Sequence, residues 1–227
     1  DDFDYTTFPD EYAEEAKEQL VAEKGFFILP SQLFCNVAAK AETDENLNET
    51  LAKTFRAIEA SAVGTDAEYK MRGLFSDFIV DNSKLGITVA DRNKVFADVI
   101  IAVRDMKLSQ DFQNNKNDTF GDTYEFLMSM YAANAGKSGG EFFTPQEVSE
   151  ILVRLATYDN DKIDSVYDPA CGSGSLLMKF QKIIGKKNPN LKYYGQEINP
   201  TTYNLCRINM FLHNVNYNNF NIALGDT

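Results

Sequence analysis

The sequence predicts an α/β fold, in which an N-terminal helical bundle is followed by the first half of a doubly wound parallel sheet. Two observations predict this fold. Apolar residues in the first half recur at spacings of three and four, which is typical of helices that share a core. After residue 140, short apolar runs alternate with amphipathic segments in the order β-α-β-α-β. Such alternation is typical of parallel sheets, which bind ligands at the carboxyl ends of their strands.

The first half contains five predicted helical segments. One ends near Gly25, a residue suited to a helix C-terminus, and a second begins at Pro30, because proline is tolerated in a first turn. Three more are predicted over 47–62, 66–78 and 92–106. The apolar positions that define the inward faces are Ala13, Ala16, Leu20 and Val21, then Leu33, Phe34, Val37 and Ala38, then Val95, Phe96, Val99, Ile100 and Val103.

A helix over 120–135 is expected to lead into the second half, with its aromatic and methionine residues packed in the core. Its inward residues are Tyr124, Leu127, Met128 and Tyr131. The polar stretch 110–118 before it is the best candidate for a domain boundary. We therefore expect a helical domain over 1–118, and a connecting helix with a partial α/β domain over 119–227.

The second half begins with a helix over 145–157, whose apolar face consists of Val148, Ile151, Leu152 and Leu155. Strands are predicted over 163–167, 191–196 and 220–224, with helices over 175–184 and 201–214 between them. A doubly wound sheet normally has more than three strands. The sequence is therefore expected to be a half-domain that is completed elsewhere, or a truncated product.

The charge of the chain argues against a protein that grips a nucleic-acid backbone unaided. The 227 residues carry a net charge of −12, and phosphate binding depends on clustered lysine and arginine. Residues 1–115 hold 22 acidic and 12 basic residues, whereas residues 116–227 hold 12 acidic and 10 basic residues. If the second half acts on DNA, the binding of the DNA phosphates must come largely from a basic partner or from chain not present here.

Several other classes of protein are disfavoured. No apolar run approaches the roughly 20 residues that cross a bilayer, and the acidic start is unlike a secretory signal, so we expect a cytoplasmic protein. The cysteines, Cys35, Cys171 and Cys206, are far apart and odd in number, which favours reduced thiols. A single histidine, His213, with scattered cysteines predicts no metal site.

The strongest chemical signal is the turn Asp168-Pro169-Ala170-Cys171-Gly172-Ser173-Gly174 between a predicted strand and helix. Glycines allow a tight turn and close approach of a ligand, and the helix start offers free N–H groups. The turn lacks the lysine of a phosphate-binding P-loop. A dinucleotide fingerprint would need a third glycine where Leu177 stands, and would not favour an acid beside pyrophosphate.

Acidic residues at the strand ends instead indicate a ligand with a cationic group. Asp168 can accept a hydrogen bond from an ammonium, Glu197 can hold a ribose diol, and Asp226 can accept from an adenine amino group. S-adenosylmethionine carries all three groups. Cap or loop roles for Asp168 and Asp226 are the alternative, and for Glu197 the two interpretations are equally supported.

These residues resemble a known family. The segments Gly140-Glu141-Phe142-Phe143-Thr144-Pro145, Asp168 to Gly174, Gln196-Glu197-Ile198-Asn199 and Gly225-Asp226 are similar to the ordered motifs of the modification subunit of type I restriction–modification systems. That subunit is an N6-adenine DNA methyltransferase, with a Rossmann-like S-adenosylmethionine-dependent fold. The segment 120–127 and the helical first half resemble its connecting helix and N-terminal domain, so the likeness extends over essentially the whole chain.

The resemblance implies roles for individual residues in binding S-adenosylmethionine. The loop before the predicted helix would contact the methionine part, with Phe142 and Phe143 as walls and Thr144 near the carboxylate, unless these rings are simply packed in the core. Asp168 would face the amino group, Glu197 the ribose, Ile198 the adenine ring and Asp226 the adenine amino group. The complete set of implied cofactor-binding residues is Glu141, Phe142, Phe143, Thr144, Pro145, Asp168, Pro169, Ala170, Gly172, Ser173, Gly174, Glu197, Ile198 and Asp226.

The chain departs from the family at one motif. These enzymes carry a catalytic Asn-Pro-Pro-aromatic loop that receives a flipped adenine, and neither Asn188-Pro189 nor Asn199-Pro200 continues in that way. No catalytic residue is therefore assigned, and these 227 residues are expected to hold most of a cofactor pocket but to be inactive alone.

The implied partners are a specificity subunit that chooses the site, a second copy of the modification subunit, a restriction subunit in the full complex, and DNA, mainly through the partners. The alternative from another class is a non-catalytic, truncated module for assembly or cofactor binding. A methylase that acts on RNA or another target is a third, less favoured possibility, because of the order of the motifs.

Overall fold

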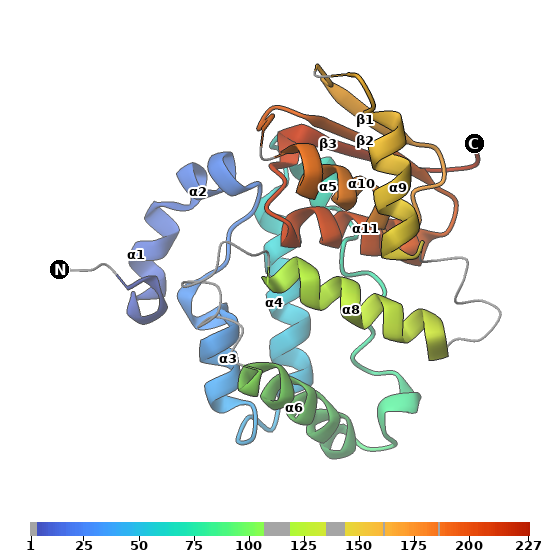
Figure 1. Ribbon diagram of the computed structural model, residues 1–227. Coiled ribbons are helices and arrows are strands. Elements are labelled where there is room, and N and C mark those ends of the chain that lie inside the picture. The colour runs from blue at the N-terminus through green and yellow to red at the C-terminus, as the bar shows by residue number, and fades with distance from the viewer. Residues whose placement is uncertain (1–3, 107–118, 135–143, 161, 186) are drawn as a thin grey trace. The chain divides into compact units, whose positions relative to one another are not determined.

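The computed structural model describes residues 4–106, 119–134, 144–160, 162–185 and 187–227 (Figure 1). The chain divides into two compact units, residues 1–114 and 115–227. The expected boundary at residue 118 stays a prediction, because residues 107–118 lie outside the described ranges. No helix in these ranges is long and apolar enough to cross a membrane.

The described part of the first unit is helical. It consists of α1 (Asp10–Glu15), α2 (Lys17–Lys24), α3 (Phe34–Lys40), α4 (Leu47–Ser61), α5 (Glu68–Met71) and α6 (Val89–Asp105), with short 3₁₀ turns at Tyr5–Thr7, Pro30–Gln32 and Ser83–Leu85. Gly25 ends α2 in the left-handed conformation, as predicted. The main core of the unit is formed by α3, α4 and α6 through Val37, Ala38, Ala41, Leu47, Leu51, Phe96, Ala97 and Ile100.

Two boundaries in this unit differ from the sequence prediction. The helix expected from Pro30 begins at Phe34, because Leu33 is extended and Pro30–Gln32 forms a separate 3₁₀ turn. Val37 and Ala38 are buried as expected, but Phe34 is exposed. The helix α6 begins at Val89, where Thr88 and Asp91 form a reciprocal capping box.

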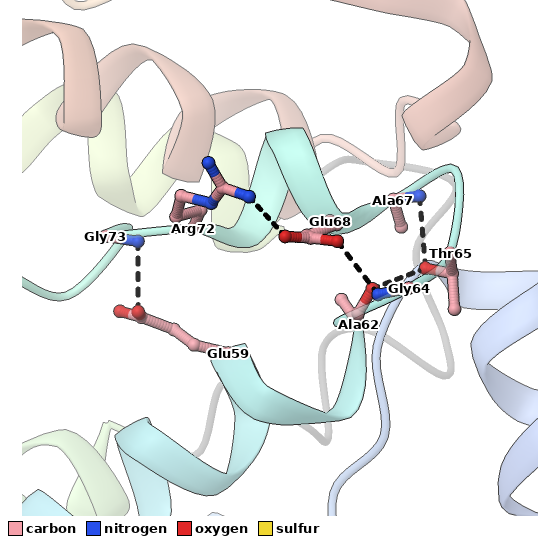
Figure 2. A network of polar contacts seen from close by, with 8 residues as sticks. All are labelled: Glu59, Ala62, Gly64, Thr65, Ala67, Glu68, Arg72 and Gly73. Carbon is pink, nitrogen blue, oxygen red and sulfur yellow. Dashed lines mark hydrogen bonds and ion pairs between the residues drawn. The ribbon is translucent and has the colours of Figure 1, made fainter.

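The helix expected over 66–78 is the larger error, since only Glu68–Met71 is helical. A network of acidic side chains fixes this region as a turn instead (Figure 2). The Glu59 carboxylate accepts from the backbone N–H of Gly73 at 3.0 Å. Glu68 accepts from the N–H of Gly64 at 2.8 Å and pairs with the Arg72 guanidinium. Side-chain acceptors thus replace the helical partners of these N–H groups.

The second unit consists of α8 (Thr119–Asn134), α9 (Gln146–Ala156), β1 (Ser165–Asp168), α10 (Ser175–Phe180), β2 (Lys192–Glu197), α11 (Pro200–Leu212) and β3 (Phe220–Leu224), with a π-helical turn at Gln181–Gly185 and a 3₁₀ turn at Tyr217–Asn219. The described strands form a parallel sheet in the order β1-β2-β3. The predicted β-α-β-α-β order is confirmed, and each strand lies within two residues of its predicted bounds.

Helices α10 and α11 cover one face of the sheet (Figure 1). Helix α11 packs on β2 and β3, α10 packs on β1, and α9 packs beside α10. The side chains of the strands alternate accordingly, with Val166, Tyr193 and Ile222 buried beneath the helices, and Tyr167 and Tyr194 exposed on the opposite face. Crossovers between parallel strands are right-handed as a rule, and two of them in the same direction place both connecting helices on one face.

Candidate functional site at the strand ends

The three strands end at one edge of the sheet, and each strand end carries an acidic residue. Asp168 and Glu197 are the last residues of β1 and β2, and Asp226 lies two residues beyond β3. The parallel register pairs Asp168 with Gly195 and Glu197 with Leu224. The acidic residues that the sequence singled out therefore gather at the edge where parallel α/β sheets bind ligands.

The turn after β1 needs glycine for two separate reasons. Gly172 and Gly174 have φ angles of +55° and +86°, in the left-handed region that favours glycine. A Cβ atom at Gly174 would also lie 2.8 Å from the Cys206 sulfur. The Gly174 N–H donates to the Cys171 carbonyl at 2.8 Å, and Gly174 is the N-cap of α10. The turn is therefore tight and backed by side chains of the domain.

Two buried thiols fill the space behind this turn. The sulfur atoms of Cys171 and Cys206 lie 3.8 Å apart, and a Cβ at Gly195 would come within 2.8 Å of the Cys171 sulfur. The contact with Cys171, together with burial, raises the pKa of Cys206. Both residues are free, buried cysteines, so they serve here as packing groups.

Asp168 lies beside the turn in a partly buried position. Its carboxylate accepts from the Ala170 N–H at 3.0 Å. The pKa of Asp168 is raised, chiefly because the carboxylate is partly buried. The Ala170 hydrogen bond opposes this effect, and the nearby charge of Glu197 adds to it. A carboxylate whose charged form is disfavoured in this way would be stabilised by a cationic ligand group.

Glu197 holds the loops on both sides of it. Its two carboxylate oxygens accept from the N–H groups of Gly172 at 3.0 Å and of Asn199 at 2.8 Å. The sequence supported two roles for Glu197 equally, binding of a ribose and stabilisation of a loop. The observed hydrogen bonds are those of a residue that stabilises loops. Each carboxylate oxygen can accept a second hydrogen bond, so the ribose role stays a prediction.

The segment after β3 is attached to the end of β2. The Gly225 N–H donates to the Glu197 carbonyl at 2.9 Å, and the Gln196 side-chain amide donates to the Asp226 carbonyl. The Asp226 carboxylate itself is exposed and accepts from the N–H of Thr227 at 3.0 Å. Gln196 thus positions the backbone of a predicted site residue.

The remaining predicted residues differ in accessibility. Pro169, Ala170 and Ile198 are exposed at the same edge, and the exposed fraction of Ile198 is 65%. Ser173 is buried, and its carbonyl accepts from the Asn209 side-chain amide at 3.0 Å, so it contacts the domain interior.

The predicted contacts before α9 are only partly described. Thr144 and Pro145 directly precede α9. The predicted contacts Glu141, Phe142 and Phe143 lie outside the described residues.

Three further residues support the site, although sequence reasoning gave them no role in it, namely Gln196, Cys206 and Asn209. Cys206 and Asn209 are three residues apart in α11, and both are fully buried. A polar asparagine on the inward face of an amphipathic helix was the available signal, because a buried amide needs a partner such as the carbonyl of a neighbouring turn.

Helix α8 is attached to the rest of this unit by polar contacts. The Lys182 ammonium lies 2.5 Å from Asp122 and 3.0 Å from the buried Glu125. Burial alone would lower the pKa of Lys182, but its contacts with the two carboxylates outweigh that effect and raise it. The Tyr124 hydroxyl donates to the Leu205 carbonyl at 2.9 Å.

The predicted inward face of α8 is only partly buried. Of its residues, Met128 is buried and Leu127 is exposed, and the Tyr131 side chain lies outside the described part.

Comparisons with known proteins agree with this arrangement. The N-6 DNA Methylase family matches residues 115–227. The chain is 50% identical over 234 residues to the type I restriction enzyme MpnII methylase subunit of Mycoplasma pneumoniae, covering all of this chain and 43% of that protein. It is 37% identical over 117 residues to the MjaVIII methylase subunit of Methanocaldococcus jannaschii, covering 52% of this chain and 20% of that protein.

A solved structure supports the same relationship. The crystal structure of a type I restriction–modification methyltransferase subunit from Streptococcus thermophilus superposes with a TM-score of 0.81 at 29% identity, covering 98% of this chain and 45% of that one. The chain thus spans less than half the length of these relatives.

Proposed function

The chain belongs to the N-6 DNA methylase family, and on that premise we propose that it binds S-adenosylmethionine as part of an adenine-specific DNA methyltransferase subunit of a type I restriction–modification system. The observation that carries this proposal is the partly buried Asp168 carboxylate, whose pKa is raised, beside a glycine turn at the carboxyl edge of a parallel sheet. The arrangement offers a cationic ligand a partly buried charge partner beside a tight turn.

The residues at this edge fit the chemical groups of S-adenosylmethionine. Asp168 would accept from its ammonium group. The left-handed Gly172 and Gly174 keep the turn beside this carboxylate tight. Glu197 would bind the ribose hydroxyls with its remaining lone pairs, and the exposed Ile198 would pack on the adenine ring. Asp226 would accept from the adenine amino group. When bound, the cofactor supplies the methyl group for transfer.

The chemistry of methyl transfer needs further groups. A base inside a duplex must be flipped into a pocket before its exocyclic nitrogen is accessible, and the family uses an Asn-Pro-Pro-aromatic loop for that purpose. These 227 residues contain no such motif, so we propose that they bind the cofactor but do not transfer methyl groups alone.

The partners follow from the same role. We propose a specificity subunit, a second modification subunit and a restriction subunit as partners, with DNA held mainly through them and the assembly in the cytoplasm. The acidic residues 1–115 favour contacts with proteins over direct contacts with phosphates.

The alternative is a non-catalytic module for assembly or cofactor binding. The incomplete helical cover of the sheet favours it, because only one face is covered in the described part of the chain. The two proposals differ in whether adenine is methylated once the partners are present.

The proposal is tested by titrating S-adenosylmethionine into the protein in a calorimeter. We expect saturable 1:1 binding, and no comparable binding of NAD, which lacks the amino-acid moiety. The Asp168→Ala variant should lose more than tenfold in affinity, since a hydrogen bond to a charged group contributes roughly 1.5–3 kcal/mol. Equal binding by the variant, or no binding by either protein, would contradict the proposal.

A further inference from the structure

The backbone around Asp226 is held at two points, one on each side of its Cα atom. On the N-terminal side, the Gly225 N–H donates to the Glu197 carbonyl at 2.9 Å. On the C-terminal side, the Gln196 side-chain amide donates to the Asp226 carbonyl. Among the described residues, a Cβ atom built at Gly225 would have only the Gln196 amide nitrogen, at 4.0 Å, in its neighbourhood. With the first contact alone, Asp226 could pivot at the glycine, so the Gln196 contact restrains the direction of its side chain.

A second hydrogen bond sets the orientation of the Gln196 amide. Tyr167 and Gln196 lie on the same face of the sheet, because the register pairs Tyr167 with Tyr194 and side chains alternate along β2. The Tyr167 hydroxyl donates to Gln196 Oε1 at 3.3 Å. The Asp226 carbonyl can only accept, so the amide nitrogen must face it and the amide oxygen is left for the hydroxyl. The three residues thus form one chain of hydrogen bonds with a single consistent direction.

This chain of hydrogen bonds ends on the backbone of Asp226 and leaves the carboxylate available to a ligand. One carboxylate oxygen accepts from the Thr227 N–H at 3.0 Å, and the side chain is exposed. An ionised carboxylate only accepts hydrogen bonds, so it can pair with an amino group but not with an oxo group in the same place. A firmly held acceptor at this point would distinguish a 6-aminopurine from a 6-oxopurine, whereas an acceptor that moves freely would tolerate both.

We propose that Gln196, oriented by Tyr167, is a positioning residue that gives the cofactor site its specificity for a 6-aminopurine. The inference rests on the proposed function, in which the Asp226 carboxylate accepts from the amino group of the cofactor's own adenine. Gln196 acts through the backbone of Asp226. Its role is therefore in the choice between purines, and it is separate from the role of Asp168 as the partner of the ammonium group.

The specificity is measured by calorimetric titration with two ligands that differ only in the base. One is S-adenosylmethionine, and the other is its deaminated analogue, in which an oxygen replaces the 6-amino group. We expect the parent protein to bind S-adenosylmethionine about tenfold more tightly than the analogue, because the analogue leaves the Asp226 carboxylate without a donor.

Two variants of Gln196 remove the donor to the Asp226 carbonyl in different ways. Gln196→Leu removes both polar groups of the amide. Gln196→Glu keeps the length and the acceptor for Tyr167, but presents an oxygen to the Asp226 carbonyl. Both should reduce the preference for S-adenosylmethionine by about threefold or more, and the affinity for the analogue should stay within about twofold of the parent value. Circular dichroism establishes that each variant is folded.

Two tyrosines on the same face provide a matched pair of controls. Tyr167 and Tyr194 are neighbours in the register and are 59% and 42% exposed, but in the described part of the chain only the Tyr167 hydroxyl has a hydrogen-bond partner. Tyr167→Phe should reduce the preference by about twofold, since the amide loses the donor that orients it. Tyr194→Phe should leave the preference unchanged.

The outcomes separate this inference from the proposed function. An unchanged preference in both Gln196 variants, or equal binding of the two ligands by the parent, overturns the inference and leaves the binding of S-adenosylmethionine established. An equal loss of affinity for both ligands also overturns it, because Gln196 would then support the whole site without selecting the base. If the parent binds neither ligand, the proposed function fails and the inference fails with it.

Discussion

The two units each contain a turn lined by carboxylates, and the two turns use them in opposite ways. In the turn between α4 and α5, Glu68 accepts from the Gly64 N–H and pairs with Arg72, and these contacts lower its pKa. In the turn after β1, burial raises the pKa of Asp168 despite its hydrogen bond from Ala170. The first carboxylate is satisfied by its own unit, whereas the second would be stabilised by a cation from outside.

This difference separates a structural acid from a candidate binding acid. Both turns combine glycines in the left-handed conformation with acidic side chains, so composition alone does not distinguish them. The contacts and the burial of each carboxylate do distinguish them. Substitutions that remove the charge of Asp168 and of Glu68 are therefore expected to change the stability at pH 7 in opposite directions.

The largest effect is expected at the glycines. Gly174→Ala should destabilise the second unit by about 3 kcal/mol, from left-handed strain and from overlap with the Cys206 sulfur. Gly64→Ala, at φ +79° with open space around it, should cost the first unit only about 1 kcal/mol. Calorimetric unfolding measures both. Equal losses, or no partial rescue of Gly174→Ala by Cys206→Ala, would contradict the packing described behind the turn.

The next effect concerns Glu59, which accepts from the N–H groups of Gly73 at 3.0 Å and Phe75 at 2.9 Å. Glu59→Ala should destabilise the first unit by about 2 kcal/mol, because two backbone donors lose a charged acceptor. The exposed Glu49, which pairs with Lys53, provides the control, and Glu49→Ala should change the free energy of unfolding by less than about 0.5 kcal/mol. Urea unfolding followed by circular dichroism tests the difference; similar losses in both variants would show that Glu59 does not hold the turn.

A smaller effect is expected for the pH dependence at Asp168. Because its folded pKa is raised, the charged carboxylate destabilises the fold above that pKa, and the penalty disappears as the pH falls below the ordinary value of 3.8. Asp168→Asn should therefore be more stable than the parent at pH 7, by a margin that shrinks on acidification. Urea unfolding at a series of pH values measures the margin, and a destabilised variant at pH 7 would contradict the description of this carboxylate.

The smallest effect, of opposite sign, is expected at the partly exposed Glu68. Its folded pKa is lowered by the Gly64 N–H and Arg72, so its contribution to stability is present above the ordinary value of 4.5 and is lost as the pH falls through the folded pKa. Glu68→Gln should be less stable than the parent at pH 7 and equally stable at low pH. The same unfolding series checks this, and a difference that grows on acidification would argue against it.

Much of the second unit could be predicted from the sequence, because its signals are local. The strands over 165–168, 192–197 and 220–224 are short segments with β-branched and aromatic side chains between turn residues, and the glycine turn lies where the motif suggested. The expected helix over 66–78 failed because Glu59, which lies outside that window, captures the N–H groups of Gly73 and Phe75. Helical spacing contains no information about such a partner.

The face of α9 shows a second limit. Spacing indicated correctly that Val148, Ile151, Leu152 and Leu155 share a face, but it does not indicate what covers that face. The site residues show the same limit. The sequence predicted that Asp168, Glu197 and Asp226 lie at one edge of the sheet, but it did not indicate that Glu197 holds the neighbouring loops.

Asp168, and not Glu68 of the first unit, is the carboxylate that we propose binds a ligand. The most direct test is to measure the affinity for S-adenosylmethionine of the parent protein, Asp168→Asn and Glu68→Gln at pH 7. We expect Asp168→Asn to lose at least tenfold in affinity without losing stability, and Glu68→Gln to bind within twofold of the parent. Equal affinities for all three proteins, or a loss of binding in Glu68→Gln alone, would contradict it.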